Sequence, residues 1–79
     1  MTKDDISNLI KTRINDAIVN VCSDDNTHFE AIVISDDFTG ESRIARHQLI
    51  YACLGNAVGN EIHALSIKAY THNEWESLK

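Results

Sequence analysis

The order strand–helix–strand in the second half of the chain constrains the fold more than any other feature. Residues 28–35 (HFEAIVIS) and 62–70 (IHALSIKAY) are rich in β-branched and aromatic side chains, which is typical of strands. Residues 43–59 (RIARHQLIYACLGNAVG) lie between them and carry apolar side chains at helical spacing. Because a helical crossover between two strands of one sheet is almost always right-handed, we expect these strands to pair in parallel.

The helical segment combines an apolar stripe with a break. The predicted stripe comprises Ile44, His47, Ile50, Tyr51, Leu54 and Val58. Gly55 and Asn56 favour a break or kink, so a long helix followed by a short one is expected. Residues 36–42 (DDFTGES) form a predicted loop, and Ser42 at its end can cap the long helix.

The first half of the chain adds one helix and one strand. Residues 3–15 repeat apolar side chains at helical spacing, and Thr2 can form a capping box with Asp5. Residues 17–22 (AIVNVC) predict a strand. The turn-forming residues 23–27 (SDDNT) then predict an antiparallel hairpin with the strand that follows.

A short helix is expected at the C-terminus. Thr71 can cap it, Glu74 can complete the capping box, and Tyr70 can pack against Trp75. The predicted fold class is therefore α+β, with the order α-β-β-α-(α)-β-α. One three-stranded mixed sheet, in the order 1-2-3, is covered on one face by helices, and the 79 residues are expected to form a single domain.

Charge and hydropathy limit the partners of the chain. Seven basic residues against twelve acidic ones give a net charge of −5. Tight nonspecific binding to nucleic acid depends on Lys and Arg, so it is not expected, although Arg43 and Arg46 form a small local basic face. No apolar run reaches the ~20 residues that cross a membrane, and no signal peptide is recognisable, so a cytoplasmic location is expected.

The motifs of common enzymes are not recognisable. There is no glycine-rich phosphate-binding loop, and no nucleophile lies in a characteristic turn. The paired aspartates at 4–5, 24–25 and 36–37 suit helix caps and turns. The chain is therefore not expected to be an enzyme.

The two cysteines, Cys22 and Cys53, are thirty-one positions apart, which fits neither a disulfide framework nor a zinc motif. Cys53 is expected to be a small buried apolar residue on its helix, while the role of Cys22 stays open.

The four histidines differ in their expected surroundings. His72 should be solvated in the first turn of the last helix, and His47 should be half-buried and hydrogen-bonded on the long helix. His28 and His63 each begin a strand, with His63 on the same side as Leu65. Because the two strands are predicted to be parallel neighbours, both histidines should lie at one edge of the sheet. Two histidines are too few to bind zinc tightly, but a partner protein could add thiolates.

Several of these segments together resemble the BolA family. The resemblance runs through HFEAIVISDDFTGESRIARHQLIYACL, EIHALSIKAY and THNEW, which cover nearly all of residues 28–75. It combines the patterns F-x-G-x-S, R-H-x-L-[IV]-Y, [IV]-H-A-[LV] and T-x-x-E-W. IHALSIKAYT is similar to the YrbA/IbaG subgroup, whereas RIARHQLIY is more similar to BolA proper.

The resemblance implies a fold like the type II KH domain and a heterodimer with a monothiol glutaredoxin. It implies a [2Fe-2S] cluster bridged between the two proteins, with the glutaredoxin supplying a cysteine and bound glutathione, and with no cofactor in the isolated chain. Carried onto this sequence, the family pattern assigns one ligand to His63 in the third strand. It assigns the other to His28 at the end of the loop between the first two strands, with Cys22 at the beginning of that loop as the second choice.

One departure concerns nucleic acid. KH domains bind nucleic acid through a G-x-x-G loop, but the corresponding residues 55–59 (GNAVG) place three residues between the glycines. Some BolA proteins are described as transcriptional regulators, so DNA binding through Arg43 and Arg46 is the alternative function.

Overall fold

The computed structural model describes all 79 residues. Its helices and strands are α1 (Lys3–Arg13), β1 (Ile18–Cys22), β2 (His28–Ile34), α2 (Arg43–Leu54), β3 (Ala64–Tyr70) and α3 (His72–Leu78). Two short 3-10 turns, η1 (Asp36–Phe38) and η2 (Gly55–Ala57), precede and follow α2. No helix has the length and apolar character needed to cross a membrane.

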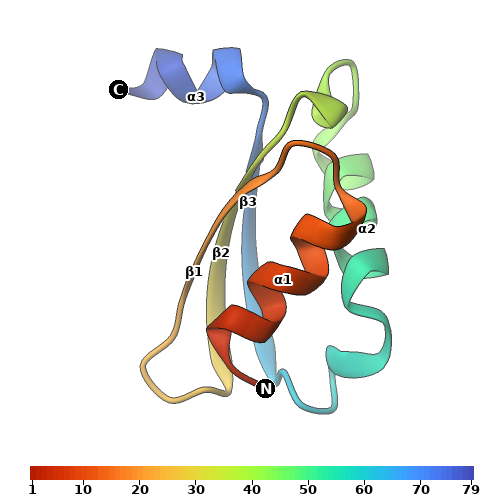
Figure 1. Cartoon of the computed structure of the whole chain (residues 1–79), viewed down its shortest axis with the longest axis vertical. Helices are drawn as coiled ribbons and strands as arrows, with labels where there is room; N and C mark the ends of the chain where they lie inside the picture. The colour runs from red at the N-terminus through yellow and green to blue at the C-terminus, as the bar shows by residue number, and fades with distance from the viewer.

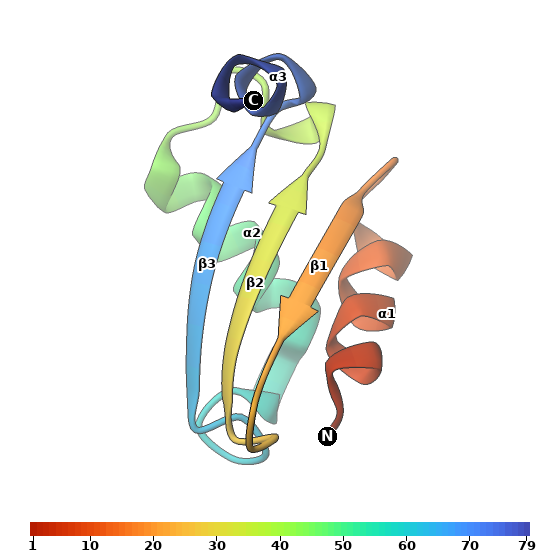
Figure 2. The ribbon, with the colours of Figure 1, turned by 90° about the vertical axis from the view of Figure 1, so that its left-hand side faces the viewer.

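The sheet has the predicted topology. Its order is β1-β2-β3, with β1 antiparallel to β2 and β2 parallel to β3. Helices α1 and α2 cover one face of the sheet, and the other face is open along most of its length (Figures 1 and 2). Helix α3 extends from the upper end of β3 on the side opposite to α1 and α2 (Figure 1). The α+β fold and the parallel crossover are therefore confirmed.

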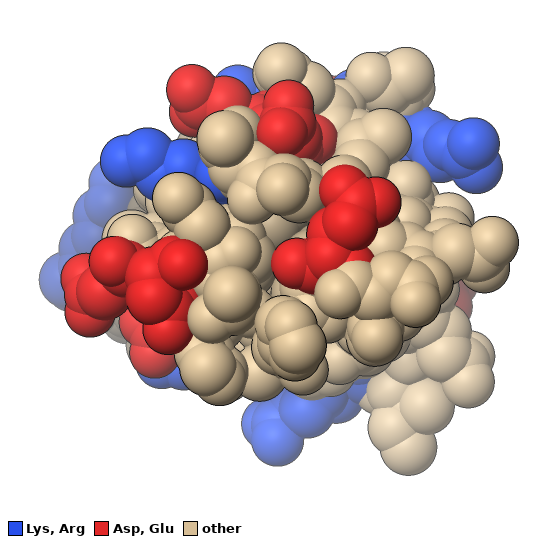
Figure 3. Space-filling view, turned by 90° about the horizontal axis from the view of Figure 1, so that it is seen from below, with Lys and Arg blue, Asp and Glu red and all other residues tan.

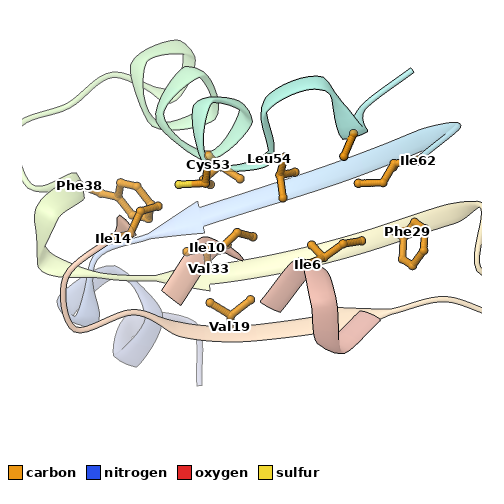
Figure 4. Packing of buried hydrophobic residues seen from close by; sticks show 12 residues of the cluster. Ile6, Ile10, Ile14, Val19, Phe29, Val33, Phe38, Cys53, Leu54 and Ile62 are labelled. Carbon is orange, nitrogen blue, oxygen red and sulfur yellow. The ribbon is translucent and has the colours of Figure 1, made fainter. Parts of the chain in front are cut away.

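The core lies between the sheet and the two covering helices (Figure 4). On β2, alternate residues Phe29, Ala31 and Val33 are buried and face these helices, as a strand with one covered face requires. Helix α1 contributes Ile6 and Ile10, which are fully buried. Twelve buried apolar residues pack together as a single core.

The predicted helix caps are confirmed. Thr2 and Asp5 form a reciprocal capping box at α1. Thr71 and Glu74 form the second capping box, at α3. The rings of Tyr70 and Trp75 pack with their centroids 5.5 Å apart.

The ends of three predicted elements are corrected. Helix α1 ends at Arg13 rather than at residue 15, because Ile14 takes an extended backbone conformation. Strand β1 begins one residue later than predicted. Strand β2 ends one residue early, because Ser35 becomes the cap of η1: its hydroxyl accepts the Asp37 backbone N–H and donates to the Asn15 carbonyl.

The predicted apolar stripe of α2 is partly wrong. Ile50 and Leu54 are buried as predicted, and so is Cys53, but Ile44 and Tyr51 of the predicted stripe are exposed. Successive residues of a helix are turned by about 100°, so Tyr51 points away from the face that contains Ile50. The predicted break is confirmed at Gly55, whose φ of 58° ends α2.

Candidate metal-ligand site

Two loops meet at the lower end of the sheet (Figures 1 and 2). One joins β1 to β2, and the other leads from η2 into β3. The Thr27 carbonyl accepts backbone hydrogen bonds from His63 (2.9 Å) and from Ala64 (3.2 Å). Because His28 and Ala64 are register partners, His63 lies next to the start of β2. The prediction that His28 and His63 share one edge of the sheet is confirmed for the backbone.

His63 is exposed and lies outside the strand, so its predicted place at the start of β3 is corrected. Ile62, the residue before it, is fully buried in the core. A tight turn produces this change of direction, with the Gly59 N–H donating to the Ile62 carbonyl at 2.7 Å. His63 is thus a rim residue and is not packed in the core.

His28 is also exposed, and it is hydrogen-bonded within the β1–β2 loop. Its Nδ1 lies 2.8 Å from Asp25 Oδ2 and 3.1 Å from Thr27 Oγ1. The other carboxylate oxygen, Asp25 Oδ1, accepts the backbone N–H groups of Thr27 and His28, each at 3.0 Å. These hydrogen bonds, the His28 backbone donor first among them, hold the pKa of Asp25 far below its usual range. Asp25 is therefore an ionised acceptor at neutral pH.

Cys22 lies on the open face of the sheet, close to His28. Both residues line one shallow hollow of about 460 Å³, together with Glu30 and Ser66. This follows from the register, since Cys22 pairs with Glu30 and His28 lies two residues before Glu30 on the same face. The structure thus brings Cys22 and His28 together, whereas His63 does not line this hollow.

Few side chains at this end of the sheet could ligate a metal. Nowhere in the structure do three or more His, Cys, Asp or Glu side chains gather in a way that could hold a metal ion. The imidazoles of His28 and His63 and the thiol of Cys22 are exposed and are suitable donors for iron. A metal centre that takes only some of its ligands from this chain fits these residues better than a resident metal ion with a complete protein shell.

Few charged side chains lie in the middle of this end of the molecule, and those that do are acidic (Figure 3). Seen from below, acidic side chains interrupt a largely uncharged surface, and basic side chains lie towards its rim (Figure 3). This end of the molecule is therefore a poor surface for polyanions.

The other two histidines differ from their predicted surroundings. His47 is half-buried as predicted, but the predicted hydrogen bond is absent, since its ring makes none to the protein. His72 was expected to be solvated, yet its Nε2 is buried and has no hydrogen-bond partner. The carboxylate oxygen Oδ2 of Asp16 is 3.7 Å from this nitrogen, which is too far for a hydrogen bond.

The two arginines of the alternative site have different surroundings. Arg43 is exposed at the start of α2. The guanidinium of Arg46 instead donates to the Glu41 and Ala69 carbonyls and to both carboxylate oxygens of Glu74. Arg46 would have to give up these contacts to reach a phosphate group, so Arg43 is the more accessible of the two.

Asp25 is the residue of this site that sequence reasoning missed. The sequence of this loop predicts a turn, in which both aspartates suit the turn itself. An aspartate three residues before a candidate ligand histidine was the available signal, because ligating histidines usually donate their second ring N–H to a carboxylate or carbonyl.

Comparison with known proteins gives the family. A sequence model of the family described as BolA-like protein matches residues 5–74. The chain therefore belongs to the BolA family.

The DNA-binding transcriptional regulator BolA of Escherichia coli is 40% identical over 60 residues, which are 76% of this chain and 57% of that protein. The acid stress protein IbaG of Escherichia coli is 44% identical over 54 residues, which are 67% and 64% of the two chains. The aligned segments thus span less than two thirds of these two relatives. The solved structure of a BolA homologue from Coxiella burnetii has a TM-score of 0.84 at 39% identity and covers 96% of this chain and 97% of its own.

Proposed function

We propose that this protein is a non-enzymatic partner of a monothiol glutaredoxin and shares a bridged [2Fe-2S] cluster with it. The cluster would serve iron–sulfur assembly or trafficking, or iron and stress signalling, in the cytoplasm. The observation that carries the proposal is the pair of exposed histidines in a BolA-family chain: His28 begins β2, and His63 lies next to it, just before β3. The relatives are named as a regulator and as a stress protein, which agrees with a non-enzymatic role.

The chain's own residues would act as follows. His63 and His28 would bind through neutral ring nitrogens, with Cys22 as the alternative to His28. A [2Fe-2S] centre with histidine ligands on one iron has a higher reduction potential than one held by thiolates alone. Because a protonated imidazole cannot ligate a metal, His28 and His63 would make occupancy fall in acid. Glutathione and a cysteine would come from the glutaredoxin.

The test is reconstitution with a monothiol glutaredoxin, glutathione, iron and sulfide, followed by visible circular dichroism. The His63→Ala and His28→Ala variants should each lose or change the spectrum, because each removes a proposed ligand. Cys22→Ser should leave it unchanged if His28 is the second ligand. His47→Ala is the matched control, since it removes a histidine that lies on α2, away from both loops.

Two results would contradict this function. One is a wild-type spectrum from the His63→Ala complex, which would exclude the ligand predicted from the third strand. The other is the absence of any cluster signal when the wild-type chain and glutaredoxin are mixed under these conditions.

DNA binding is the second candidate function. It is favoured by the name of the Escherichia coli relative, a DNA-binding transcriptional regulator, and by the exposed Arg43. Selection of duplexes from a random pool should then enrich one sequence, and Arg43→Ala should reduce its recovery. Failure to enrich any sequence would remove this alternative.

A further inference from the structure

The side chain of His28 has little packing to fix its orientation. Its side chain is 68% exposed, and that of Asp25 is 52% exposed. The ring is held instead by the 2.8 Å contact between Nδ1 and Asp25 Oδ2, with Thr27 Oγ1 also 3.1 Å from the same nitrogen. The hydrogen bonds of one ring nitrogen therefore determine how this imidazole is presented.

The carboxylate of Asp25 is itself fixed to the backbone. Its Oδ1 accepts from the Thr27 and His28 N–H groups, each at 3.0 Å, and lies 3.5 Å from Ser23 Oγ. Ser23 Oγ in turn donates to the His28 carbonyl at 2.7 Å and accepts the Asn26 N–H at 3.0 Å. The two oxygens of Asp25 thus have separate roles, since Oδ1 organises the loop and Oδ2 faces the ring.

The tautomer of His28 follows from this arrangement. A carboxylate can only accept hydrogen bonds, so the imidazole nitrogen beside it must carry the proton. A neutral ring has one N–H, and Nδ1–H therefore leaves Nε2 with its free lone pair. Nε2 makes no hydrogen bond to the protein, so it is available to a metal.

We propose that Asp25 is a positioning residue that holds His28 with Nδ1 protonated and presents Nε2 as the ligand atom. His28 would ligate the shared cluster, so the metal role of Asp25 rests on the function proposed above. The tautomer of His28 in the metal-free chain does not depend on that function. The arrangement favours His28 over Cys22 as the second ligand.

The first measurement is nitrogen NMR of the His28 ring in the metal-free protein at about pH 8.5, two units above the reference pKa of histidine. The wild-type chain should show the Nδ1–H form as the major tautomer. In Asp25→Asn the amide oxygen can still accept the two backbone N–H groups, while its NH₂ group faces Nδ1. That nitrogen must then accept, so the tautomer should reverse to Nε2–H.

Asp24→Asn is the matched control. It removes the same charge from the same loop, but the Asp24 side chain makes no hydrogen bond, so the His28 tautomer should be unchanged. Far-ultraviolet circular dichroism checks that all variants are folded. The tautomer of the wild-type chain needs no variant, and a predominant Nε2–H form there would by itself overturn the proposal.

The second measurement uses the glutaredoxin complex. Asp25→Asn should change the visible circular dichroism in the same way as His28→Ala and should lower cluster retention against a chelator by about 10–100-fold. A changed spectrum for His28→Ala with a wild-type spectrum for Asp25→Asn would overturn the positioning role and leave the proposed function standing. A wild-type spectrum for His28→Ala would overturn the ligand assignment, and with it the metal role of Asp25.

Discussion

Phe38 is fully buried although it lies in the short turn η1 between β2 and α2. The Arg46 guanidinium lies over its ring, with Cζ 5.9 Å from the centroid. The turn-forming residues Asp, Thr and Gly in residues 36–42 predict a loop. A single large apolar side chain between turn residues shows no periodicity, and this is why its burial escaped prediction.

Phe38→Ala should lower the free energy of unfolding by about 3–5 kcal/mol, the usual cost of removing a buried aromatic ring. That loss is a large part of the total stability of a small domain. Chemical denaturation followed by circular dichroism measures it. Ile44→Ala is the control: Ile44 is 71% exposed, so its change should stay within about 0.5 kcal/mol. Equal losses from the two variants would contradict the assigned core.

The two thiols should differ in reactivity. Cys22 is exposed, whereas Cys53 is buried, and this burial raises the pKa of the Cys53 thiol. Alkylation requires the thiolate and access to it. Iodoacetamide should therefore modify Cys22 in the native protein and reach Cys53 only after unfolding, as mass spectrometry can follow. Modification of both thiols at the same rate under native conditions would be inconsistent with the packing of α2.

Helix α3 is held to the rest of the fold by contacts at its first turn. It has seven residues, none of them buried. Arg46 holds it to α2 through two contacts to the Glu74 carboxylate, at 2.6 and 3.2 Å. The Arg46 hydrogen bonds, followed by the Thr71 backbone N–H, lower the pKa of Glu74 to about 2 from its ordinary value of 4.5. Glu74 thus takes part both in the capping box of α3 and in the ion pair with Arg46.

Glu74→Gln should reduce stability in a pH-dependent way. A group whose pKa is lower in the folded state stabilises that state above its unfolded pKa, and this contribution is lost as the pH falls through the folded pKa. The difference in unfolding free energy between wild type and variant should therefore be largest above about pH 4.5 and shrink towards pH 2.

Urea denaturation at several pH values measures this difference. Asp5 and Asp25 also have lowered pKa values, but both chains contain them, so their contributions cancel. The control is Glu76→Gln, which removes only an exposed contact to Lys79 and should have little effect at any pH. A Glu74→Gln difference that did not vary between pH 7 and pH 2 would show that the ion pair is unimportant.

The order of the elements could be predicted because apolar periodicity and helix caps are local features of the sequence. The pairing of β2 with β3 could be predicted because crossovers follow a general rule of handedness. Tertiary contacts decided the rest. Strand alternation predicts that His63 lies on the same side as Leu65, but a tight turn places His63 at the rim and buries Ile62 instead. The partners of Asp25 and Arg46 depend on how loops fold, which composition does not specify. The ligand residues came from the family resemblance and stay predictions.

For the molecule as a whole, charge argues against general DNA binding. The chain has net charge −5, and Arg46 already pairs with Glu74. Fluorescence anisotropy with a random duplex at ~150 mM salt should therefore give a dissociation constant weaker than micromolar. If Arg43 contacts a phosphate, Arg43→Ala should reduce the salt slope by about 1. A sub-micromolar affinity for a random duplex would contradict the charge argument.

The two termini lie at opposite ends of the molecule, with Met1 beside the loops that carry His28 and His63 and Lys79 beyond α3 (Figures 1 and 2). An oligohistidine purification tag fused to Met1 would therefore place additional imidazoles close to the candidate ligands, where tethering raises their effective concentration. Such a tag could supply iron ligands that the natural chain lacks and could mask the loss of His28 or His63. A tag fused after Lys79 would sit at the far end, so cluster reconstitution is best carried out with C-terminally tagged or untagged protein.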